Sequence, residues 1–116
     1  ENSEAIRFAK QNKARAAASN VEFKRMRVRD FLKGHELSKT DFVLIDPPRA
    51  GAEDHTIELI AKMAPKQISY VSCEPSILAR DLRILIDRGY QIDAMTAIDL
   101  FPQTHHVETV VKLRKI

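Results

Sequence analysis

The sequence VSCEP at residues 71–75 marks the point where a predicted strand meets a predicted helix. Apolar side chains dominate residues 68–71, and residues 75–88 repeat them at helical spacing. Pro75 suits the first turn of a helix, because it has no backbone N–H to leave unpaired there. A strand that ends here places Cys73 at the carboxyl edge of a sheet, where open α/β folds bind their ligands.

Cys73 is the only cysteine among the 116 residues. Near the start of a helix, the partial positive charge of the helix end favours the thiolate, which is the nucleophilic form of the side chain. The alternative is a small, buried, apolar side chain without a chemical role. A single cysteine excludes an internal disulfide and a cysteine-cluster metal site, so we expect no metal and a reducing, cytoplasmic location.

Helical and strand patterns alternate along the rest of the chain. Helices are predicted from residue 2 or 3 to about residue 19, over residues 54–63 and over residues 75–88, with one helical turn at residues 29–32. Strands are predicted over residues 21–26, 42–45, 67–72, 90–98 and 107–113. No helix separates the last two strands, so they should pair antiparallel. The alternation predicts a doubly wound α/β sheet that ends in this hairpin.

Composition and charge narrow the class of protein. The chain is 44% hydrophobic and 30% charged, which is typical of one folded domain rather than a disordered segment. No apolar run reaches the length that spans a membrane, so no membrane partner is expected. The net charge of +3 permits a nucleic-acid partner but does not require one.

Three loops are expected at one edge of the predicted sheet: residues 46–51 (DPPRAG), residues 73–75, and residues 101–108 (FPQTHHVE). They would bring the thiol and the carboxylates of Asp46 and Glu108 to one crevice. Each signal alone is weak, because a histidine pair is usually a polar turn and Glu108 could be a charge at a strand edge. Together they supply a nucleophile, a base and an orienting group, which suggests an active site.

The order and spacing of DPPRAG, VSCEP and FPQTHHVE resemble the carboxyl-terminal half of the RNA 5-methyluridine (uracil-C5) methyltransferases. These enzymes use S-adenosylmethionine to methylate C5 of uridine in tRNA or rRNA. The related 5-methylcytidine enzymes carry a cysteine where this chain has Arg49, and amino-group methyltransferases carry an aromatic residue there. The resemblance covers essentially all of residues 1–116 and implies the carboxyl-terminal portion of a Rossmann-like, class I methyltransferase domain.

The resemblance also implies roles for two reactive side chains. Cys73 would add to C6 of the uracil ring and so activate C5 towards the methyl group. Glu108 would then remove the C5 proton as a general base, so that the thiol can leave. The target uridine would have to leave its base stack, because C6 is otherwise out of reach.

Further contacts follow from the same resemblance. Asp46 would lie between the S-adenosylmethionine and the target base, and Glu1 matches the acidic residue that binds the ribose of the cofactor. Arg49 and His106 would contact the RNA, although a purely structural loop role remains the alternative for His106. A tRNA or an rRNA is therefore the expected partner.

Two residues depart from the family pattern. Glu74 stands where the family usually has asparagine, and Arg27 stands where it often has an acidic or amide residue that contacts adenine. A carboxylate aimed at Cys73 would oppose thiolate formation, so we expect Glu74 to point outward or to cap the following helix.

The chain contains no glycine-rich loop, so the resemblance implies a fragment that lacks the first two strands of the family's sheet. We expect such a fragment to be inactive alone. Residues 21–26 would then pair elsewhere, or another copy of the chain would fill the gap, or a strand edge would stay exposed and promote self-association. The alternative to an enzyme is a non-catalytic RNA-binding or assembly module that keeps the methyltransferase fold.

Overall fold

The structure is a computed structural model that describes residues 2–34 and 40–116. Its helices are α1 (Ser3–Arg15), α2 (Val28–Gly34), α3 (Thr56–Met63) and α4 (Pro75–Asp87). Its strands are β1 (Phe42–Ile45), β2 (Gln67–Ser72), β3 (Tyr90–Ile98) and β4 (Glu108–Lys115). Within the described ranges, no helix is long and apolar enough to cross a membrane.

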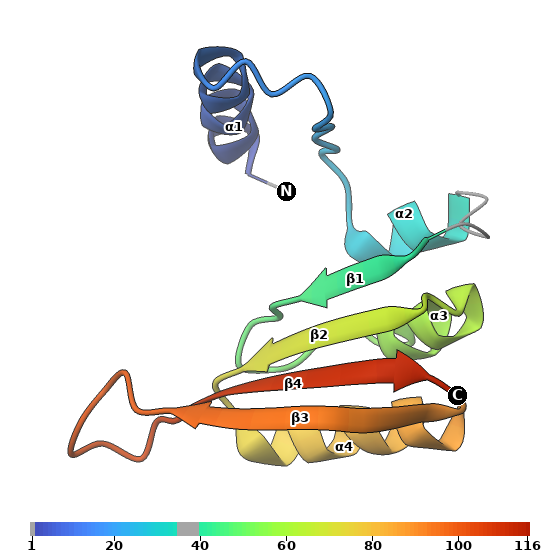
Figure 1. Ribbon diagram of the computed structural model, residues 1–116. Helices are drawn as coiled ribbons and strands as arrows, with labels where there is room; N and C mark the ends of the chain where they lie inside the picture. The colour runs from blue at the N-terminus through green and yellow to red at the C-terminus, as the bar shows by residue number, and fades with distance from the viewer. Residues whose placement is uncertain (1, 35–39) are drawn as a thin grey trace.

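The strands form one sheet in the order β1-β2-β4-β3 (Figure 1). β1 and β2 run parallel, whereas β4 runs antiparallel to both of its neighbours, β2 and β3. Because β4 returns between β2 and β3, its first residue lies at the edge of the sheet where β1 and β2 end. This arrangement confirms the predicted α/β class and the predicted carboxyl-terminal hairpin.

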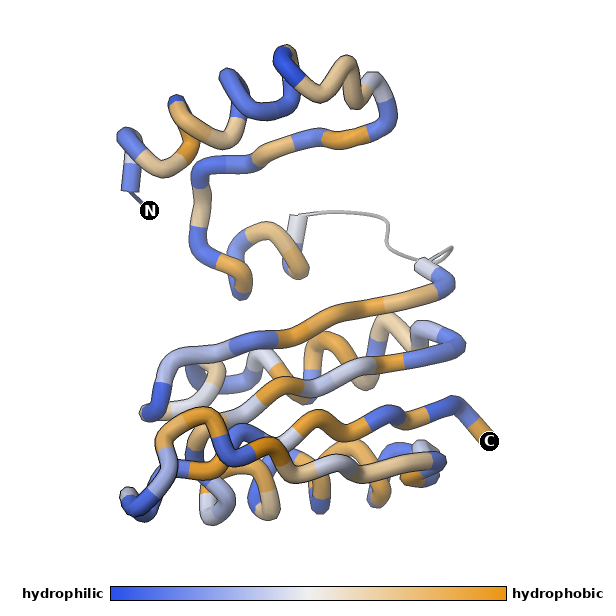
Figure 2. The backbone as a smooth tube through the Cα atoms, turned by 60° about the vertical axis from the view of Figure 1, so that its left-hand side comes forward, coloured by the Kyte–Doolittle hydropathy of each residue, from blue (hydrophilic) through white to orange (hydrophobic). Residues whose placement is uncertain are grey.

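Helices α2, α3 and α4 lie on one face of the sheet (Figures 1 and 2). The core forms between that face and the apolar sides of α3 and α4, and its large side chains are Ile45, Ile57, Ile60, Ile68, Tyr70, Leu78, Leu82, Leu85, Tyr90, Val111 and Leu113. On the opposite face, apolar side chains of β1 and β3 stay exposed: Phe42, Leu44 and Ile98 are 52%, 65% and 40% accessible. Among the described residues, only one face of the sheet is therefore packed.

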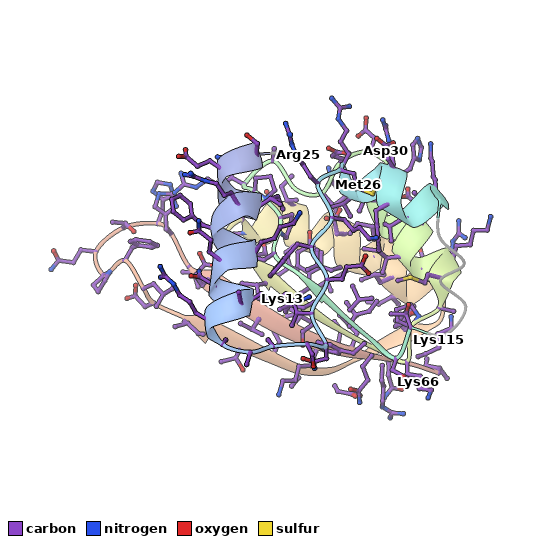
Figure 3. The ribbon with its side chains drawn as sticks, turned by 90° about the horizontal axis from the view of Figure 1, so that it is seen from above. Lys13, Arg25, Met26, Asp30, Lys66 and Lys115 are labelled. Atoms are coloured by element: carbon purple, nitrogen blue, oxygen red, sulfur yellow. The ribbon has the colours of Figure 1, made fainter. Side chains whose placement is uncertain are left out.

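The two ends of the sheet differ in character. At one end, where Figure 3 labels both residues, the backbone N–H of Lys115 donates to the carbonyl of Lys66. The buried Tyr90 hydroxyl donates to the Pro65 carbonyl over 2.8 Å at this same end. The other end carries the motif-bearing loops, so structural and candidate functional contacts are separated along the strands.

Helix α1 stands apart from the sheet and has no buried residue (Figure 1). The side chain of Asn2 caps it by accepting hydrogen bonds from the backbone N–H groups of Glu4 and Ala5. The prediction that it extends to about residue 19 is wrong by four residues, since it ends at Arg15 and the backbone of Ala17 turns left-handed with φ 50°. A left-handed residue ends a helix because its carbonyl leaves the helical direction.

The predicted strand at residues 21–26 is also wrong, because these residues form no strand. Alternating apolar residues favour an extended backbone, but a strand forms only when a neighbouring strand pairs with it. The predicted helical turn at residues 29–32 is the longer α2, and α3 begins at Thr56, after a turn closed by the left-handed His55. Among the described strands, β1 has β2 on one side and no partner on the other, so its outer edge is open.

Candidate active site

Cys73 lies in the turn between β2 and α4, as its sequence position predicts. Its thiol is free and half-buried. The preceding residue, Ser72, is the last residue of β2 and is only 5% exposed. The Ser72 hydroxyl accepts a hydrogen bond from the Glu74 backbone N–H and donates one to the Glu74 carbonyl, both over 3.1 Å. Cys73 therefore lies between Ser72 and Glu74, which are joined by these two hydrogen bonds.

Glu74 caps helix α4, which confirms one of the two orientations expected for it. Its Oε1 accepts hydrogen bonds from the Ser76 hydroxyl at 2.8 Å and from the Ser76 backbone N–H at 3.4 Å. These hydrogen bonds lower the pKa of the Glu74 carboxyl, and the nearby charges of His105 and Arg49 act in the same direction. The carboxylate is thus engaged by the helix start, and its departure from the family pattern has a structural role.

Glu108 is the first residue of β4 and is half-buried. Ser72 pairs with Thr109 across the antiparallel strands, so the residue after Ser72 and the residue before Thr109 are neighbours across the strand pair. Those two residues are Cys73 and Glu108. Because Thr109 is buried against the helices, the alternation of side chains puts Glu108 on the opposite, uncovered face of the sheet.

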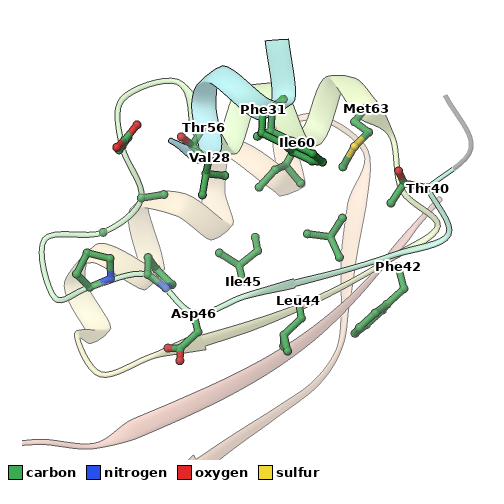
Figure 4. A pocket seen from close by; sticks show the side chains of 17 residues that line it. Val28, Phe31, Thr40, Phe42, Leu44, Ile45, Asp46, Thr56, Ile60 and Met63 are labelled. Carbon is green, nitrogen blue, oxygen red and sulfur yellow. The ribbon is translucent and has the colours of Figure 1, made fainter. Parts of the chain in front are cut away.

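Asp46 directly follows β1, whose last residue pairs with Tyr70 of β2. Its carboxylate is exposed and points to the same side of β1 as Leu44 and Phe42, away from the side of Ile60 (Figure 4). Asp46 and Glu108 therefore belong to the same uncovered face, at the same edge of the sheet. The structure places these two carboxylates and Cys73 at the strand ends of one sheet edge, and the crevice that they would share stays a prediction.

The loop at residues 46–51 is anchored on helix α4 through Gly51. Gly51 is buried, has φ +88°, and donates its backbone N–H to the Pro48 carbonyl over 2.8 Å. A Cβ atom at this position would lie 2.6 Å from Ile77 Cγ2 and 2.8 Å from Arg80 Nη2. Both the backbone angle and the space require glycine, so the close approach fixes the loop against α4.

The loops at residues 46–51 and 101–108 meet through Arg49 and His106. Arg49 Nη2 lies 3.5 Å from His106 Nε2. The His106 ring also contacts the rings of His105, with centroids 4.0 Å apart, and Phe101, with centroids 6.3 Å apart. Partial burial and then the positive charges of Arg49 and His105 lower the pKa of His106. A neutral ring can accept a hydrogen bond from the guanidinium, so the two predicted substrate contacts form one cluster.

Two of the larger cavities in the described part of the chain lie away from Cys73. One, of about 680 Å³, lies between α2, β1 and α3 (Figure 4) and reaches Asp46 at its rim, with Val28, Phe31, Ile60 and Met63 among its lining residues. The other, of about 820 Å³, lies between residues 26–29, which include Arg27, and a second segment made of Pro48 and residues 50–54. Cys73 lines neither cavity, so the thiol turn and these hollows are separate features. Glu1 lies outside the described residues.

Tyr70 and Asp81 form a buried pair outside the three motif loops, and the sequence contains a signal for this pair. Asp81 stands on the apolar side of α4, at helical spacing from Leu78 and Leu85, and is 1% exposed. It accepts a hydrogen bond from Tyr70 of β2. A charged residue on the apolar side of a helix requires a partner, and this signal identifies Asp81 as a buried polar anchor.

Comparison of the sequence with models of protein families identifies the family of this chain. The family described as tRNA (Uracil-5-)-methyltransferase matches residues 1–116. The chain belongs to this family. The predicted resemblance to uracil-C5 methyltransferases is confirmed, as is the methyltransferase fold.

Individual relatives agree with the family match. An uncharacterized RNA methyltransferase of Thermotoga maritima is 42% identical over 111 residues, which cover 96% of this chain and 25% of that protein. A 23S rRNA (uracil(1939)-C(5))-methyltransferase of Shewanella denitrificans is 40% identical over 108 residues, which cover 92% of this chain and 23% of that protein.

A solved structure matches the fold as well. The Pyrococcus abyssi tRNA (uracil-54, C5)-methyltransferase, crystallised in complex with S-adenosyl-L-homocysteine, superimposes with a TM-score of 0.79 at 37% identity. The match covers 97% of this chain and 26% of that one. The chain therefore spans about a quarter of the length of the relatives that it matches.

Proposed function

We propose that this chain carries the catalytic residues for methylation of uridine at C5 in RNA, by a covalent mechanism in which Cys73 is the nucleophile. The observation that carries the proposal is the pairing of Ser72 with Thr109, which puts Cys73, the residue after β2, next to Glu108, the first residue of β4. Family membership supports the reaction class. The printed names of the Shewanella and Pyrococcus relatives support uridine in rRNA or tRNA as the substrate.

The proposed chemistry follows from the weakness of uracil C5 as a nucleophile. The Cys73 thiolate forms a bond to C6, and the electron pair of the C5=C6 double bond moves to give an enolate centred on C5 and O4. S-adenosylmethionine would supply the methyl group as an electrophilic sulfonium, so that a C5–CH3 bond forms, the S–CH3 bond breaks and S-adenosyl-L-homocysteine leaves. Glu108 then takes the proton from C5, the double bond re-forms, and the thiolate leaves C6. Each bond made to the enzyme is thereby broken again.

The residues at the sheet edge fit S-adenosylmethionine as the methyl donor. Asp46 has an exposed carboxylate at the carboxyl end of β1, and it forms no ion pair or hydrogen bond with another described residue. An unengaged acidic group at this edge is suited to polar groups of a bound ligand. The Pyrococcus structure contains S-adenosyl-L-homocysteine, the demethylated form of this donor. The ribose contact assigned to Glu1 stays a prediction.

Arg49 and His106 are proposed to contact the RNA. Arg49 is exposed and lies next to His106 on the loop that leads into β4. A guanidinium can pair with a phosphate, and exposed rings such as Phe101 can stack on unpaired bases. RNA is the proposed partner for this cluster, and a cytoplasmic location remains a prediction that follows from it.

The test of the reaction is covalent trapping with 5-fluorouridine RNA, in which fluorine at C5 cannot leave as a proton. The complete gene product is incubated with this RNA and S-adenosylmethionine and then analysed on a denaturing gel. We expect a covalent band for wild type and none for Cys73→Ala. If wild type binds both ligands yet forms no band, the proposed mechanism is wrong and a non-catalytic RNA-binding module is the better description.

Residues 1–116 by themselves are proposed to be inactive and to self-associate. The open edge of β1 and the exposed apolar side chains of Phe42 and Leu44 favour pairing with another copy. Light scattering of the isolated chain tests this proposal. The Asp41 carbonyl accepts from the Gln67 N–H, so residues 41, 43 and 45 direct their backbone groups to β2 and Leu44 directs its own to the open edge. We expect a mass above that of a monomer, which falls when Leu44→Pro removes a backbone donor from this open edge. A monomeric wild-type chain would contradict it.

A further inference from the structure

Ser72 occupies an unusual place beside the candidate nucleophile. Ser72 is the last residue of β2, and it pairs with Thr109 of the neighbouring strand β4. On its carboxyl-terminal side its hydroxyl bonds to both backbone groups of Glu74, over 3.1 Å each. One buried side chain therefore connects the last position of the sheet to the residue that begins the next helix.

The far end of this connection is also fixed. The Glu74 carbonyl accepts a second hydrogen bond, over 3.0 Å, from the backbone N–H of Leu78 in the first turns of α4. The Glu74 side chain caps the same helix through Ser76. Cys73 and the capping residue Glu74 are thus the two residues between β2 and α4, and the hydrogen bonds of the Ser72 hydroxyl span Cys73.

We propose that Ser72 is a positioning residue, whose hydroxyl fixes the turn that presents the Cys73 thiol to C6 of the target uridine. This inference rests on the proposed function. A nucleophile that attacks a bound ring must be held in a narrow range of positions, and small displacements slow the attack strongly. Ser72 supplies that restraint through the backbone of Cys73, without touching the substrate.

The test measures the first-order rate of adduct formation in the complete gene product, with S-adenosylmethionine and saturating 5-fluorouridine RNA. Ser72→Ala removes both hydrogen bonds across the turn, so we expect the rate to fall by about 10- to 100-fold. The affinity for RNA should not change, because Ser72 is buried. Ser72→Thr, which keeps the hydroxyl, should recover most of the rate.

A matched control separates positioning from general stability. Tyr90→Phe also removes a buried hydroxyl that donates to a backbone carbonyl, but at the other end of the sheet. We expect Tyr90→Phe and Ser72→Ala both to lower the melting temperature and only Ser72→Ala to slow the adduct. If Ser72→Ala does not fold, the isosteric pair Ser72→Thr and Ser72→Val gives the same comparison, with the hydroxyl as the only difference.

The pH profile of adduct formation distinguishes a misplaced Cys73 thiolate from a Cys73 thiol whose pKa has changed. A misplaced thiolate reacts slowly at every pH, so the deficit of Ser72→Ala should persist when the pH is raised until the thiol is fully ionised. A deficit that disappears at high pH would overturn the proposal, and so would a Ser72→Ala variant that forms the adduct at the wild-type rate. Absence of an adduct in wild type would instead contradict the proposed function.

Discussion

Tyr70 of β2 and Asp81 of α4 form a buried hydrogen bond, in which the tyrosine hydroxyl donates to Asp81 Oδ2 over 2.5 Å. Arg80 completes the group, since its Nε and Nη2 each lie 2.9 Å from Asp81 Oδ1. Burial and then the bond to the carboxylate raise the pKa of Tyr70 well above its usual value. Because Arg80 Nη2 occupies the space that a Cβ on Gly51 would need, this group also lies against the loop that carries Arg49.

Tyr70→Phe should lower the free energy of unfolding. The change removes one donor from a buried carboxylate, and hydrogen bonds to charged groups typically contribute about 1.5–3 kcal/mol. Tyr90→Phe, which loses a hydrogen bond to a neutral carbonyl, should cost about 1 kcal/mol on the same scale. Urea denaturation measures both values. Equal losses in the two variants would mean that the Asp81 carboxylate adds nothing to the Tyr70 bond.

Gly51→Ala should disturb the loop at residues 46–51. A non-glycine residue at φ +88° is strained by about 1–2 kcal/mol, and the new methyl group would also press on Ile77 and Arg80. We expect lower stability and weaker binding of RNA, because Arg49 is two residues away. Gly34→Ala is the control, since no atom lies within 4 Å of a Cβ there. Similar losses in both variants would exclude a specific role for the Gly51 contact.

Much of this architecture can be predicted from sequence because its signals are local. The strand, turn and helix around Cys73 follow from an apolar run, a proline and a helical repeat within residues 67–88. The final hairpin follows from two strand patterns with no helix between them. The neighbouring positions of Cys73 and Glu108 then result from the antiparallel pairing of β2 and β4.

Other features depend on partners that local patterns do not specify. Residues 21–26 have a strand pattern, but a strand requires a neighbour, and none of the described strands pairs with them. The double hydrogen bond of Ser72 depends on the shape of the turn rather than on residue type. The bond from Tyr70 to Asp81 joins two elements, although the charge on an apolar helix side does signal that a partner exists.

His106 should titrate below the usual histidine range, and Arg49→Gln should raise its pKa. Partial burial is the larger cause of the lowered pKa and the guanidinium charge is the next, so removing the charge leaves only part of the shift. NMR titration of the His106 ring measures both values. An unchanged midpoint in Arg49→Gln would show that the two side chains do not interact in solution.

The same shift predicts the direction of a pH effect on stability. Because the folded state binds the His106 proton less tightly than the unfolded state, folding releases it. The contribution of His106 to the free energy of unfolding is present in full above the ordinary histidine pKa. It declines as the pH falls through 6.5 towards the lowered pKa of the folded state. Denaturant midpoints at several pH values should show this trend in wild type and a smaller one in His106→Gln.

Glu108→Gln should stop the reaction after methyl transfer. The amide cannot accept the C5 proton, so the thiolate of Cys73 cannot leave and the covalent enzyme–RNA adduct should accumulate even with ordinary uridine RNA. Release of methylated RNA should fall by about 10²- to 10⁴-fold, the range typical of a lost general base. Intact-mass spectrometry of the adduct and single-turnover release of labelled RNA measure the two effects.

Asp99→Asn is the control for that experiment, because it neutralises an exposed carboxylate in the same hairpin, one residue beyond β3. Asp99→Asn should release product at the wild-type rate and accumulate no adduct. If Glu108→Gln instead lowers adduct formation and product release together, Glu108 acts before or during attack by Cys73. Proton removal from C5 would then have to be assigned to another group, and Asp46, which shares the uncovered face of the sheet, would be the next residue to test.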